Sequence, residues 1–322
     1  MTGAVNGQLA VFGAGAFGTA LAIALAERFE QVALVARGEA VADQLQVARA
    51  NEKYLPGITL PNNITVTAQL VPCDLVLWAV PAQTTAQTLT ERAGDLVDSG
   101  TVVICAKGLD LASGRRLSVV ANGAAPNSKI AFLSGPGFAA DIAAGLPTAM
   151  TIAARTGSLD LAQRLSTSRL RLYGSDDVTG VELGGALKNV VAIAAGIAMG
   201  AGYGESARAA LVTRGFAEIC RIAGAMGAKP ETLMGLSGFG DLMLTASSTQ
   251  SRNVAYGMAI GAGKKLPDRL AEGAKTASVA YTLAADLSVD TPVMAQTVAL
   301  IEGRISVADA MDELLARDVR SE

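Results

Sequence analysis

Apolar residues in the first half of the chain gather in short runs, separated by more polar stretches of helix length. The runs are QLAVF at 8–12, QVALVA at 31–36, CDLVLWAV at 73–80, TVVICA at 101–106, KIAFLS at 129–134, TAMTIA at 148–153 and LRLYG at 170–174. Between most of them lie segments of helix length, for example 82–97, 111–122 and 158–168. Buried strands that alternate with helices are typical of a parallel, doubly wound sheet. We therefore predict a Rossmann-type α/β domain.

The pattern changes after about residue 176, where the strand signals stop. Segments such as GVELGGALKNVVAIAAG and SARAALVTRGFAEICRIAGAMG repeat their apolar residues with the period of a helix. A chain of 322 residues is also too long for one small core and suits two domains. We expect a dinucleotide-binding α/β domain over 1–178 and an all-α substrate domain over 179–322.

Composition narrows the function classes. The net charge of -3 gives no basic patch, so we expect no nucleic-acid partner. We predict no membrane span, because no apolar run reaches about 18 residues without a polar break. The first residues, MTGAVNGQ, lack the pattern of a signal peptide, and the three distant cysteines fit reduced core residues, so we expect a cytoplasmic protein.

The chain contains no histidine at all. Proton transfer near neutral pH must therefore use Lys, Asp, Glu, Tyr or Cys. Histidine-ligated metal sites and Ser-His-Asp or Cys-His mechanisms are excluded, and we expect no metal site.

Three glycines form a G-x-G-x-x-G motif between the first strand and the first helix. The first, Gly13, allows a tight turn, Gly15 lets the backbone approach a pyrophosphate, and Gly18 lets helix and strand pack closely. The helix N-terminus then receives the negative charge of a dinucleotide. The alternative is a glycine turn that binds no ligand.

The end of the second predicted strand bears on the choice of cofactor. An NAD-preferring domain usually carries Asp or Glu there, to bind the ribose 2′-hydroxyl. This strand ends in Ala36 and Arg37 instead, and Arg37 could pair with a 2′-phosphate. The residues favour NADP over NAD, and the alternative for Arg37 is a solvated surface charge.

Two further strands end in groups that suit an anion at the same edge of the sheet. TVVICA leads into Lys107, and KIAFLS leads into a Gly135-Pro136-Gly137 turn. A cation beside bare backbone N–H groups would suit a phosphate or carboxylate. The alternatives are an exposed loop lysine and plain turn chemistry.

A second polar cluster lies in SGFGDLMLTASSTQSRN at 237–253. Asp241 follows a glycine-rich turn, and Ser251, Arg252 and Asn253 come together one short helix later. The planar guanidinium of Arg252 matches a phosphate, and its two neighbours add neutral donors. Asp241 could instead be a helix N-cap, and Ser-Arg-Asn a polar cap and turn.

The stretch GGALKNVVAIAAG at 184–196 places Lys188 and Asn189 in an otherwise apolar helix. A buried ammonium must be paired or lose its proton. Burial and a second cation such as Lys107 favour the neutral amine, whereas the carboxylate of Asp241 favours the ammonium. We interpret Lys188 as a general acid and Asn189 as a hydrogen-bonding partner. The alternative is a lysine that extends from a helix end into solvent.

Several long motifs together resemble the bacterial NAD(P)-dependent glycerol-3-phosphate dehydrogenase family. They are FGAGAFGTALA, NEKYLPGITLP, DLVLWAVPAQ, AKGLD, LSGPGFAADIAAGLPTAM, ELGGALKNVVAIAAG and GFGDLMLTASSTQSRN, in the family's order from residue 11 to 253. A weaker likeness continues to the end of the chain. The resemblance implies reversible, NAD(P)H-dependent reduction of dihydroxyacetone phosphate to sn-glycerol 3-phosphate, which feeds glycerophospholipid synthesis.

The resemblance also implies roles for single residues. Lys188 takes the place of the family's proton donor and acceptor. The positions that match substrate contacts are Lys107, Gly135, Gly137, Lys188, Asn189, Asp241, Ser251, Arg252 and Asn253, with Thr245 as an added polar neighbour. The positions that match or are expected to make cofactor contacts are Gly13, Gly15, Ala16, Phe17, Gly18, Arg37, Lys107, Ala139, Arg252, Leu270 and Glu272.

Two departures from the family pattern stand out. Gly137 occupies the place of a Ser or Thr, so only its backbone can contact the substrate. The segment LPDRLA before Glu272 is shorter than usual, which places Leu270 and Glu272 in doubt as cofactor contacts. The alternatives for the whole chain are a β-hydroxyacid dehydrogenase or ketopantoate-type reductase, and a non-catalytic NADP sensor. Its many apolar helical segments lead us to expect a homodimer.

Overall fold

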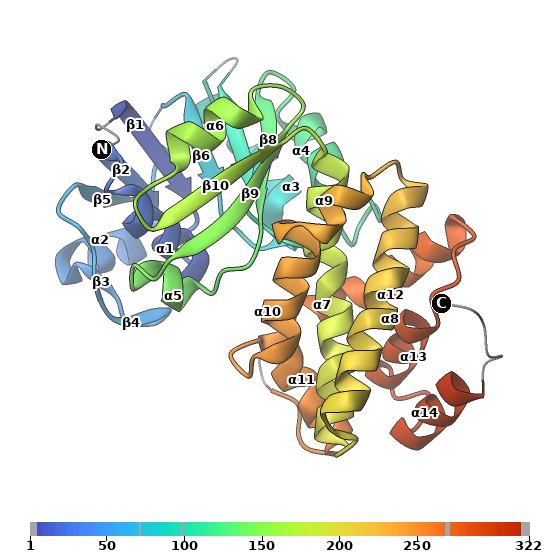
Figure 1. Ribbon diagram of the computed structural model, residues 1–322. Coiled ribbons are helices and arrows are strands. Elements are labelled where there is room, and N and C mark those ends of the chain that lie inside the picture. Colours follow the sequence, from blue (N-terminus) through green and yellow to red (C-terminus); the bar gives the residue numbers. More distant parts are fainter. Residues whose placement is uncertain (1–4, 71, 98–99, 268–270, 317–322) are drawn as a thin grey trace. The chain divides into compact units, whose positions relative to one another are not determined.

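The computed structural model describes residues 5–70, 72–97, 100–267 and 271–316. The chain divides into two compact units. Unit 1 comprises Met1–Asp110 and Arg115–Glu182, and unit 2 comprises Leu111–Gly114 and Leu183–Glu322. Figure 1 shows a twisted sheet with helices in unit 1 and a set of helices in unit 2.

An eight-stranded sheet forms the centre of unit 1, in the order β10-β9-β8-β7-β6-β1-β2-β5. Its strands are β1 (Val5–Phe12), β2 (Phe29–Val35), β5 (Ile64–Thr67), β6 (Leu75–Trp78), β7 (Thr101–Ile104), β8 (Lys129–Ser134), β9 (Thr148–Ala154) and β10 (Leu170–Ser175). From β5 to β8 the strands are parallel in the order of a dinucleotide-binding sheet. The strand order reverses between β1 and β6, and ligands bind beyond the carboxyl ends of strands at such a point. The predicted α/β sheet is confirmed.

The structure corrects the predicted sheet in two places. β9 pairs antiparallel with β8, whereas all strands were expected to be parallel. An apolar run indicates a buried strand but carries no information on its direction. The sequence analysis also missed β5, a four-residue edge strand, and the small hairpin of β3 (Ala50–Asn51) and β4 (Leu55–Thr59).

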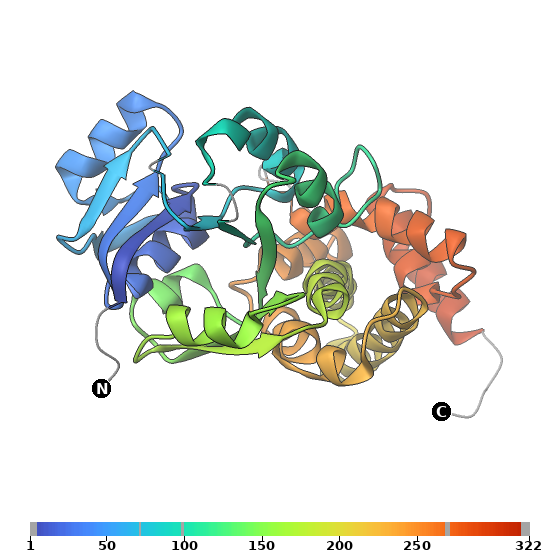
Figure 2. The ribbon, with the colours of Figure 1, turned by 90° about the horizontal axis from the view of Figure 1, so that it is seen from above.

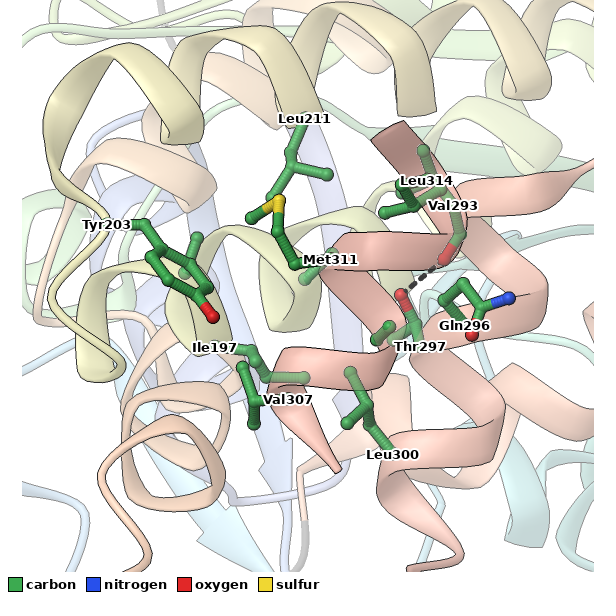
Figure 3. Close-up of a pocket in the computed structure, with 13 residues that line it drawn as sticks. Ile197, Tyr203, Leu211, Val293, Gln296, Thr297, Leu300, Val307, Met311 and Leu314 are labelled. Carbon is green, nitrogen blue, oxygen red and sulfur yellow. Dashed lines mark hydrogen bonds between the residues drawn. The ribbon is translucent and has the colours of Figure 1, made fainter. Parts of the chain in front are cut away.

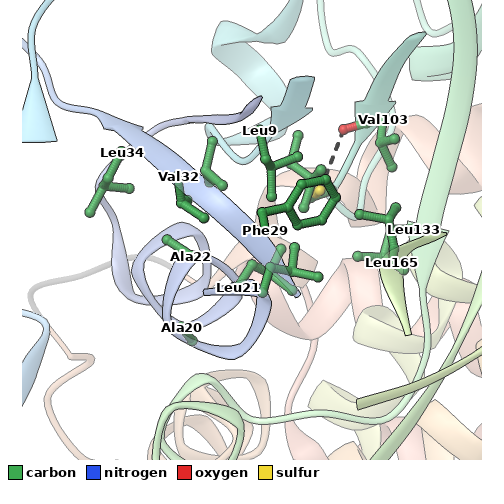
Figure 4. Packing of buried hydrophobic residues seen from close by; sticks show 14 of the residues in the cluster. Leu9, Ala20, Leu21, Ala22, Phe29, Val32, Leu34, Val103, Leu133 and Leu165 are labelled. Carbon is green, nitrogen blue, oxygen red and sulfur yellow. Dashed lines mark hydrogen bonds between the residues drawn. The ribbon is translucent and has the colours of Figure 1, made fainter. Parts of the chain in front are cut away.

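Helices cover both faces of this sheet, because side chains of successive strand residues point to opposite faces. The helical elements of unit 1 are α1 (Ala16–Leu25), α2 (Glu39–Ala48), α3 (Ala82–Glu91), η1 (Ala93–Asp95), α4 (Leu117–Ala124), α5 (Ala139–Ala143) and α6 (Ser158–Leu165). On one face Leu9, Val32 and Leu133 pack against α1, α2, α5 and α6 (Figure 4). On the other face Trp78 and Phe132 pack against α3 and α4.

Unit 2 is helical throughout its described residues. Its elements are α7 (Val178–Gly200), which begins in unit 1, α8 (Gly204–Ala225), α9 (Pro230–Met234), the π-helical turn η2 (Leu236–Gly240), α10 (Asp241–Ser247), α11 (Arg252–Gly261), α12 (Glu272–Asp286), α13 (Pro292–Ile301) and α14 (Val307–Leu315). Figure 2 looks along α7, with other helices of unit 2 around it.

Helix α7 is the core helix of unit 2. Every residue from Gly180 to Ala198 is buried. By length and composition α7 could cross a membrane, but 89% of its most apolar window is buried inside the protein, as in the core helix of a folded domain. Two of its polar residues, Lys188 and Asn189, are therefore enclosed in an otherwise apolar stretch from Leu183 to Ala198.

Candidate active site

The glycine motif of unit 1 forms a tight turn with an open side. Gly13 has φ +116°, and a Cβ there would lie 2.7 Å from the carbonyl oxygen of Ala79. A Cβ on Gly18 would lie 2.0 Å from the carbonyl oxygen of Gly13, so helix and strand meet at backbone distance. A Cβ on Gly15 would have no atom within 4 Å, and α1 begins at Ala16 without a side-chain cap. The turn thus offers uncapped N–H groups beside open space, which fits a dinucleotide pyrophosphate.

A buried asparagine that the sequence analysis did not single out supports this turn. The Asn51 amide donates to the carbonyl oxygen of Ala14 at 3.1 Å and to Oγ1 of Thr19 at 2.8 Å. Its position in the NEKYLPG motif was the available signal. Asn51 therefore ties the glycine turn to the first turn of α1.

Lys107 and Gly135 meet at the carboxyl edge of β7 and β8. Lys107 Nζ donates to the carbonyl oxygen of Gly135 at 2.8 Å. The same Nζ lies 5.9 Å from the ring centroid of Phe17, on α1. The structure therefore brings these predicted residues together beside the glycine turn. Arg37 follows β2 and is exposed, and Ala139 begins α5, which packs on α1.

The amine of Lys188 lies in a buried polar cluster of unit 2. Nζ donates to Oδ1 of Asp241 at 2.5 Å and to Oγ1 of Thr245 at 2.5 Å. The side chains of Lys188 and Asp241 are 6% and 2% exposed. Asp241 and Thr245 lie one turn apart on α10, so both face α7. The lysine does not extend into solvent, and its charge has an enclosed partner.

Backbone approaches at glycines hold α10 and η2 close to α7. A Cβ on Gly184 would lie 2.9 Å from Cα of Gly238, in η2. A Cβ on Gly238 would lie 2.0 Å from the carbonyl oxygen of Leu233. The glycines of SGFGD thus let the chain turn directly into Asp241 beside the lysine helix.

Asn189 and Asn253 form a second buried network. The Asn253 amide nitrogen donates to Oδ1 of Asn189 at 2.9 Å, and its Oδ1 accepts the backbone N–H of Gly273 at 2.9 Å. The network joins α7, the start of α11 and the start of α12. Ser251 is the N-cap of α11, and its Oγ accepts from the N–H of Val254.

Arg252 and Glu272 are exposed neighbours at the starts of α11 and α12. Nη2 of Arg252 lies 4.0 Å from Oε1 of Glu272, and the two side chains are 55% and 42% exposed. Arg252 directly precedes Asn253, and Glu272 directly precedes Gly273, the two residues that a hydrogen bond joins. Leu270, the other predicted contact in this segment, lies outside the described residues.

Two more buried carboxylates act as remote helix caps. Glu182 accepts the N–H and the hydroxyl of Ser118 at 2.9 and 2.6 Å, at the start of α4. Glu218 accepts the N–H groups of Val293 and Met294 at 2.7 and 3.0 Å, at the start of α13. Burial raises the pKa of Glu182, and it raises the pKa of Glu218 to about 7.

A small apolar cavity of about 30 Å³ lies among α7, α8, α13 and α14 (Figure 3). Ile197, Leu211, Met311 and Leu314 point into it. It has room for about one water molecule, and its lining has few polar partners to hold one. None of the predicted site residues lines this cavity. Its apolar lining does not suit a phosphorylated substrate.

Two family models match most of the chain. Residues 8–159 match the model described as NAD-dependent glycerol-3-phosphate dehydrogenase N-terminus, and 177–312 match the corresponding C-terminus. The chain belongs to this family.

Individual members of the family are similar over nearly the full length. Glycerol-3-phosphate dehydrogenase [NAD(P)+] from Chelativorans sp. (strain BNC1) is 48% identical, over 98% of both chains. The namesake from Paracoccus denitrificans is 49% identical, over 98% of this chain and 100% of the relative. A crystal structure of glycerol-3-phosphate dehydrogenase from Coxiella burnetii has a TM-score of 0.89 at 33% identity and covers 97% of this chain and 99% of that one.

Gly137 is a departure that the structure helps to explain. A Cβ at this position would lie 3.0 Å from Cδ1 of Ile142 and 3.2 Å from Cγ2 of Thr148. The Ser or Thr typical of the glycerol-3-phosphate dehydrogenase family would need these two side chains to move. The absence of a side chain at 137 thus leaves room for Ile142 of α5 and Thr148 of β9.

Proposed function

We propose that this chain is an NAD(P)-dependent sn-glycerol-3-phosphate dehydrogenase. It reduces dihydroxyacetone phosphate reversibly to sn-glycerol 3-phosphate, and so supplies glycerophospholipid synthesis. The observation that carries the proposal is the buried Lys188–Asp241–Thr245 cluster, in a family member that has no histidine for proton transfer.

Unit 1 supplies the proposed cofactor site. When bound, the nicotinamide cofactor supplies or accepts a hydride. Gly13, Gly15 and Gly18 with the N–H groups of α1 suit its pyrophosphate, and Ala16, Phe17 and Ala139 line the same end of α1. Ala36 at the end of β2 cannot accept a bond from the ribose 2′-hydroxyl, and Arg37 suits a 2′-phosphate, so we propose NADP as the preferred cofactor, with NAD as the alternative.

Lys188 is the proposed proton donor in the reduction. Hydride transfer to the C2 carbon leaves negative charge on the C2 oxygen, and Nζ of Lys188 transfers a proton to that oxygen. The reverse reaction returns the proton from the C2 hydroxyl to Nζ. The Asp241 carboxylate and the Thr245 hydroxyl accept hydrogen bonds from Nζ and fix its position.

Arg252 is the proposed phosphate ligand. It is an exposed guanidinium at the N-terminus of α11, and a helix N-terminus adds its own N–H groups to an anion site. Ser251, Asn253 and Asn189 pack around the same helix start, and we assign Lys107, Gly135 and Gly137 to the substrate as well. Leu270 and Glu272 remain proposed cofactor contacts.

A steady-state assay tests the proposal. Oxidation of NADPH and NADH is followed with dihydroxyacetone phosphate, and then with 2-oxo and 3-oxo acids as the substrates of the alternative reductases. We expect turnover with dihydroxyacetone phosphate only, and a higher kcat/KM with NADPH. Turnover of an oxo acid alone, or cofactor binding without any turnover, would contradict the proposal.

The variant Lys188→Ala tests the assigned proton donor. We expect its kcat to fall by about two to four orders of magnitude, which is the usual contribution of a general acid to the rate, while it still binds NADPH. Near-normal kcat would remove Lys188 from this role.

We also propose a cytoplasmic homodimer. The free thiols of Cys73, Cys105 and Cys220 fit a reducing compartment, and exposed apolar side chains such as Met234 and Leu315 are available for a subunit contact. Light scattering after size exclusion measures the mass, and a monomer of 32.6 kDa would contradict the dimer.

A further inference from the structure

Two glycines on α7 bring its backbone against the carbonyl groups of α11. A Cβ on Gly196 would lie 2.3 Å from the carbonyl oxygen of Val254. A Cβ on Gly200, one turn later, would lie 2.2 Å from that of Met258. Distances below about 3.0 Å are essentially never found for a real Cβ. Neither position can take a side chain unless the helices move apart.

Two glycines on α11 make the reciprocal contacts. A Cβ on Gly257 would lie 2.2 Å from the carbonyl oxygen of Ile193, and one on Gly261 would lie 2.1 Å from that of Ile197. The four positions define the glycine seam: Gly196 and Gly200 on α7, Gly257 and Gly261 on α11. Most helix pairs are held 8–10 Å apart by side chains that can adopt other rotamers. In the glycine seam the backbones of α7 and α11 contact each other directly, so no change of side-chain rotamer can alter the distance between the two helices.

The glycine seam begins within about two turns of the functional residue on each helix. Lys188 is about two turns before Gly196 on α7. Arg252 is the first residue of α11, less than two turns before Gly257. The 2.9 Å hydrogen bond between Asn189 and Asn253 joins the residues that follow Lys188 and Arg252. The two helices are thus fixed to each other at both sides of this stretch.

We propose that the glycine seam fixes the separation between the amine of Lys188 and the guanidinium of Arg252, and thereby the length of phosphorylated ketone that the enzyme reduces. The inference rests on the proposed function, in which these two residues bind opposite ends of one substrate. A substrate with one more methylene group between carbonyl and phosphate would then misplace its carbonyl. A misplacement of about 1 Å can cost roughly 100-fold in rate.

The experiment compares two substrates in variants of the glycine seam. The substrates are dihydroxyacetone phosphate and its homologue with one added methylene, 4-hydroxy-3-oxobutyl phosphate. In Gly257→Ala the added methyl group must move α11 from α7 by about 1 Å, because the 2.2 Å contact has to reach at least 3.0 Å. We expect kcat/KM for dihydroxyacetone phosphate to fall about 100-fold, while that for the homologue falls less than tenfold. The ratio of the two kcat/KM values should therefore drop at least tenfold.

Two control variants separate this effect from general changes in the helices. Gly224→Ala adds the same methyl group to α8 where no atom lies within 4 Å, and it should leave the ratio unchanged. Val298→Ala removes buried methyl groups from α13, a helix that contributes no residue to the seam, and lowers stability. If Val298→Ala changes the ratio as much as Gly257→Ala does, the ratio reports destabilisation and the proposal is wrong.

A second seam variant keeps the test decisive if Gly257→Ala does not fold. Gly200→Ala lies at the last residue of α7, about three turns after Lys188, so it should displace Lys188 less and lower the ratio by a smaller factor. An unchanged ratio in the folded seam variants would overturn the proposal. A wild-type enzyme that reduces neither ketone would refute the proposed function instead.

Discussion

The buried ion pair of Lys188 and Asp241 gives a sharp test through stability. The two side chains are 6% and 2% exposed, so solvent hardly screens their attraction. Removal of one partner from a buried pair leaves an uncompensated charge and costs about 3–5 kcal/mol. Lys188→Met and Asp241→Asn should each lower the free energy of unfolding by about this amount.

The double variant decides between pairing and independent effects. With both charges removed, neither partner is left as an uncompensated buried charge, and we expect a loss of about 1–3 kcal/mol in place of the roughly 6–10 kcal/mol that additive losses would give. Urea unfolding followed by far-ultraviolet circular dichroism measures the four free energies. Thr245→Val adds a comparison, because it removes only the neutral hydroxyl that accepts from Nζ.

The result that refutes this reasoning is additivity. If the double variant loses the sum of the two single losses to within about 0.5 kcal/mol, the charges do not stabilise each other. The assignment of Asp241 as the charged partner of Lys188 would then fall as well.

Three further predictions concern other parts of the molecule. Gly15→Ala should leave the unfolding temperature unchanged, because its Cβ meets no atom within 4 Å, but it should raise the Kd for NADPH at least tenfold in a fluorescence titration. The control is Gly123→Ala, at an equally open position on α4, and equal Kd values for the two variants would disprove the prediction. Because burial raises the pKa of Glu218 from 4.5 to about 7, this carboxyl contributes stability that is fully present below pH 4.5 and lost as the pH rises through 7. The free energy of unfolding of the wild type should therefore fall by about 3 kcal/mol relative to that of Glu218→Gln between pH 4.5 and 8. A difference that stays constant with pH would count against a raised pKa of Glu218. Arg252→Ala should raise KM for dihydroxyacetone phosphate at least tenfold and leave the weak reduction of dihydroxyacetone unchanged; equal losses on both ketones would argue against a phosphate ligand.

Local signals in the sequence predicted the sheet and the position of the glycine turn at its carboxyl edge. The strand–glycine–helix pattern predicted the turn at Gly13 correctly, because the positive φ of Gly13 and the close backbone contact at Gly18 arise between residues near each other in the sequence. The antiparallel direction of β9 and the edge strand β5 depend on pairing partners that no short pattern contains. The periodicity of apolar residues could therefore predict neither the direction of β9 nor the presence of the edge strand β5.

The start of α4 shows the same limit at one helix. The pattern predicted a helix over 111–122, but α4 spans Leu117–Ala124. Arg116, at its N-cap, makes no side-chain cap, and the first N–H groups are bound by Glu182, 64 residues along the chain. In the candidate site, the apolar surroundings of Lys188 indicated burial, whereas its contacts with Thr245 and the pairing of Asn189 with Asn253 required the fold. The catalytic and binding roles of these residues stay predictions.

The remote cap on α4 has a consequence for the order in which the chain acquires its structure. A ribosome releases residues 117–124 well before Glu182, so this segment leaves the exit tunnel without the acceptor for its first N–H groups. A nascent chain halted before residue 182 should hold a frayed α4, although every strand of the sheet has by then been synthesised. Completion of unit 1 during translation thus waits for the first residues of the helix that carries the lysine.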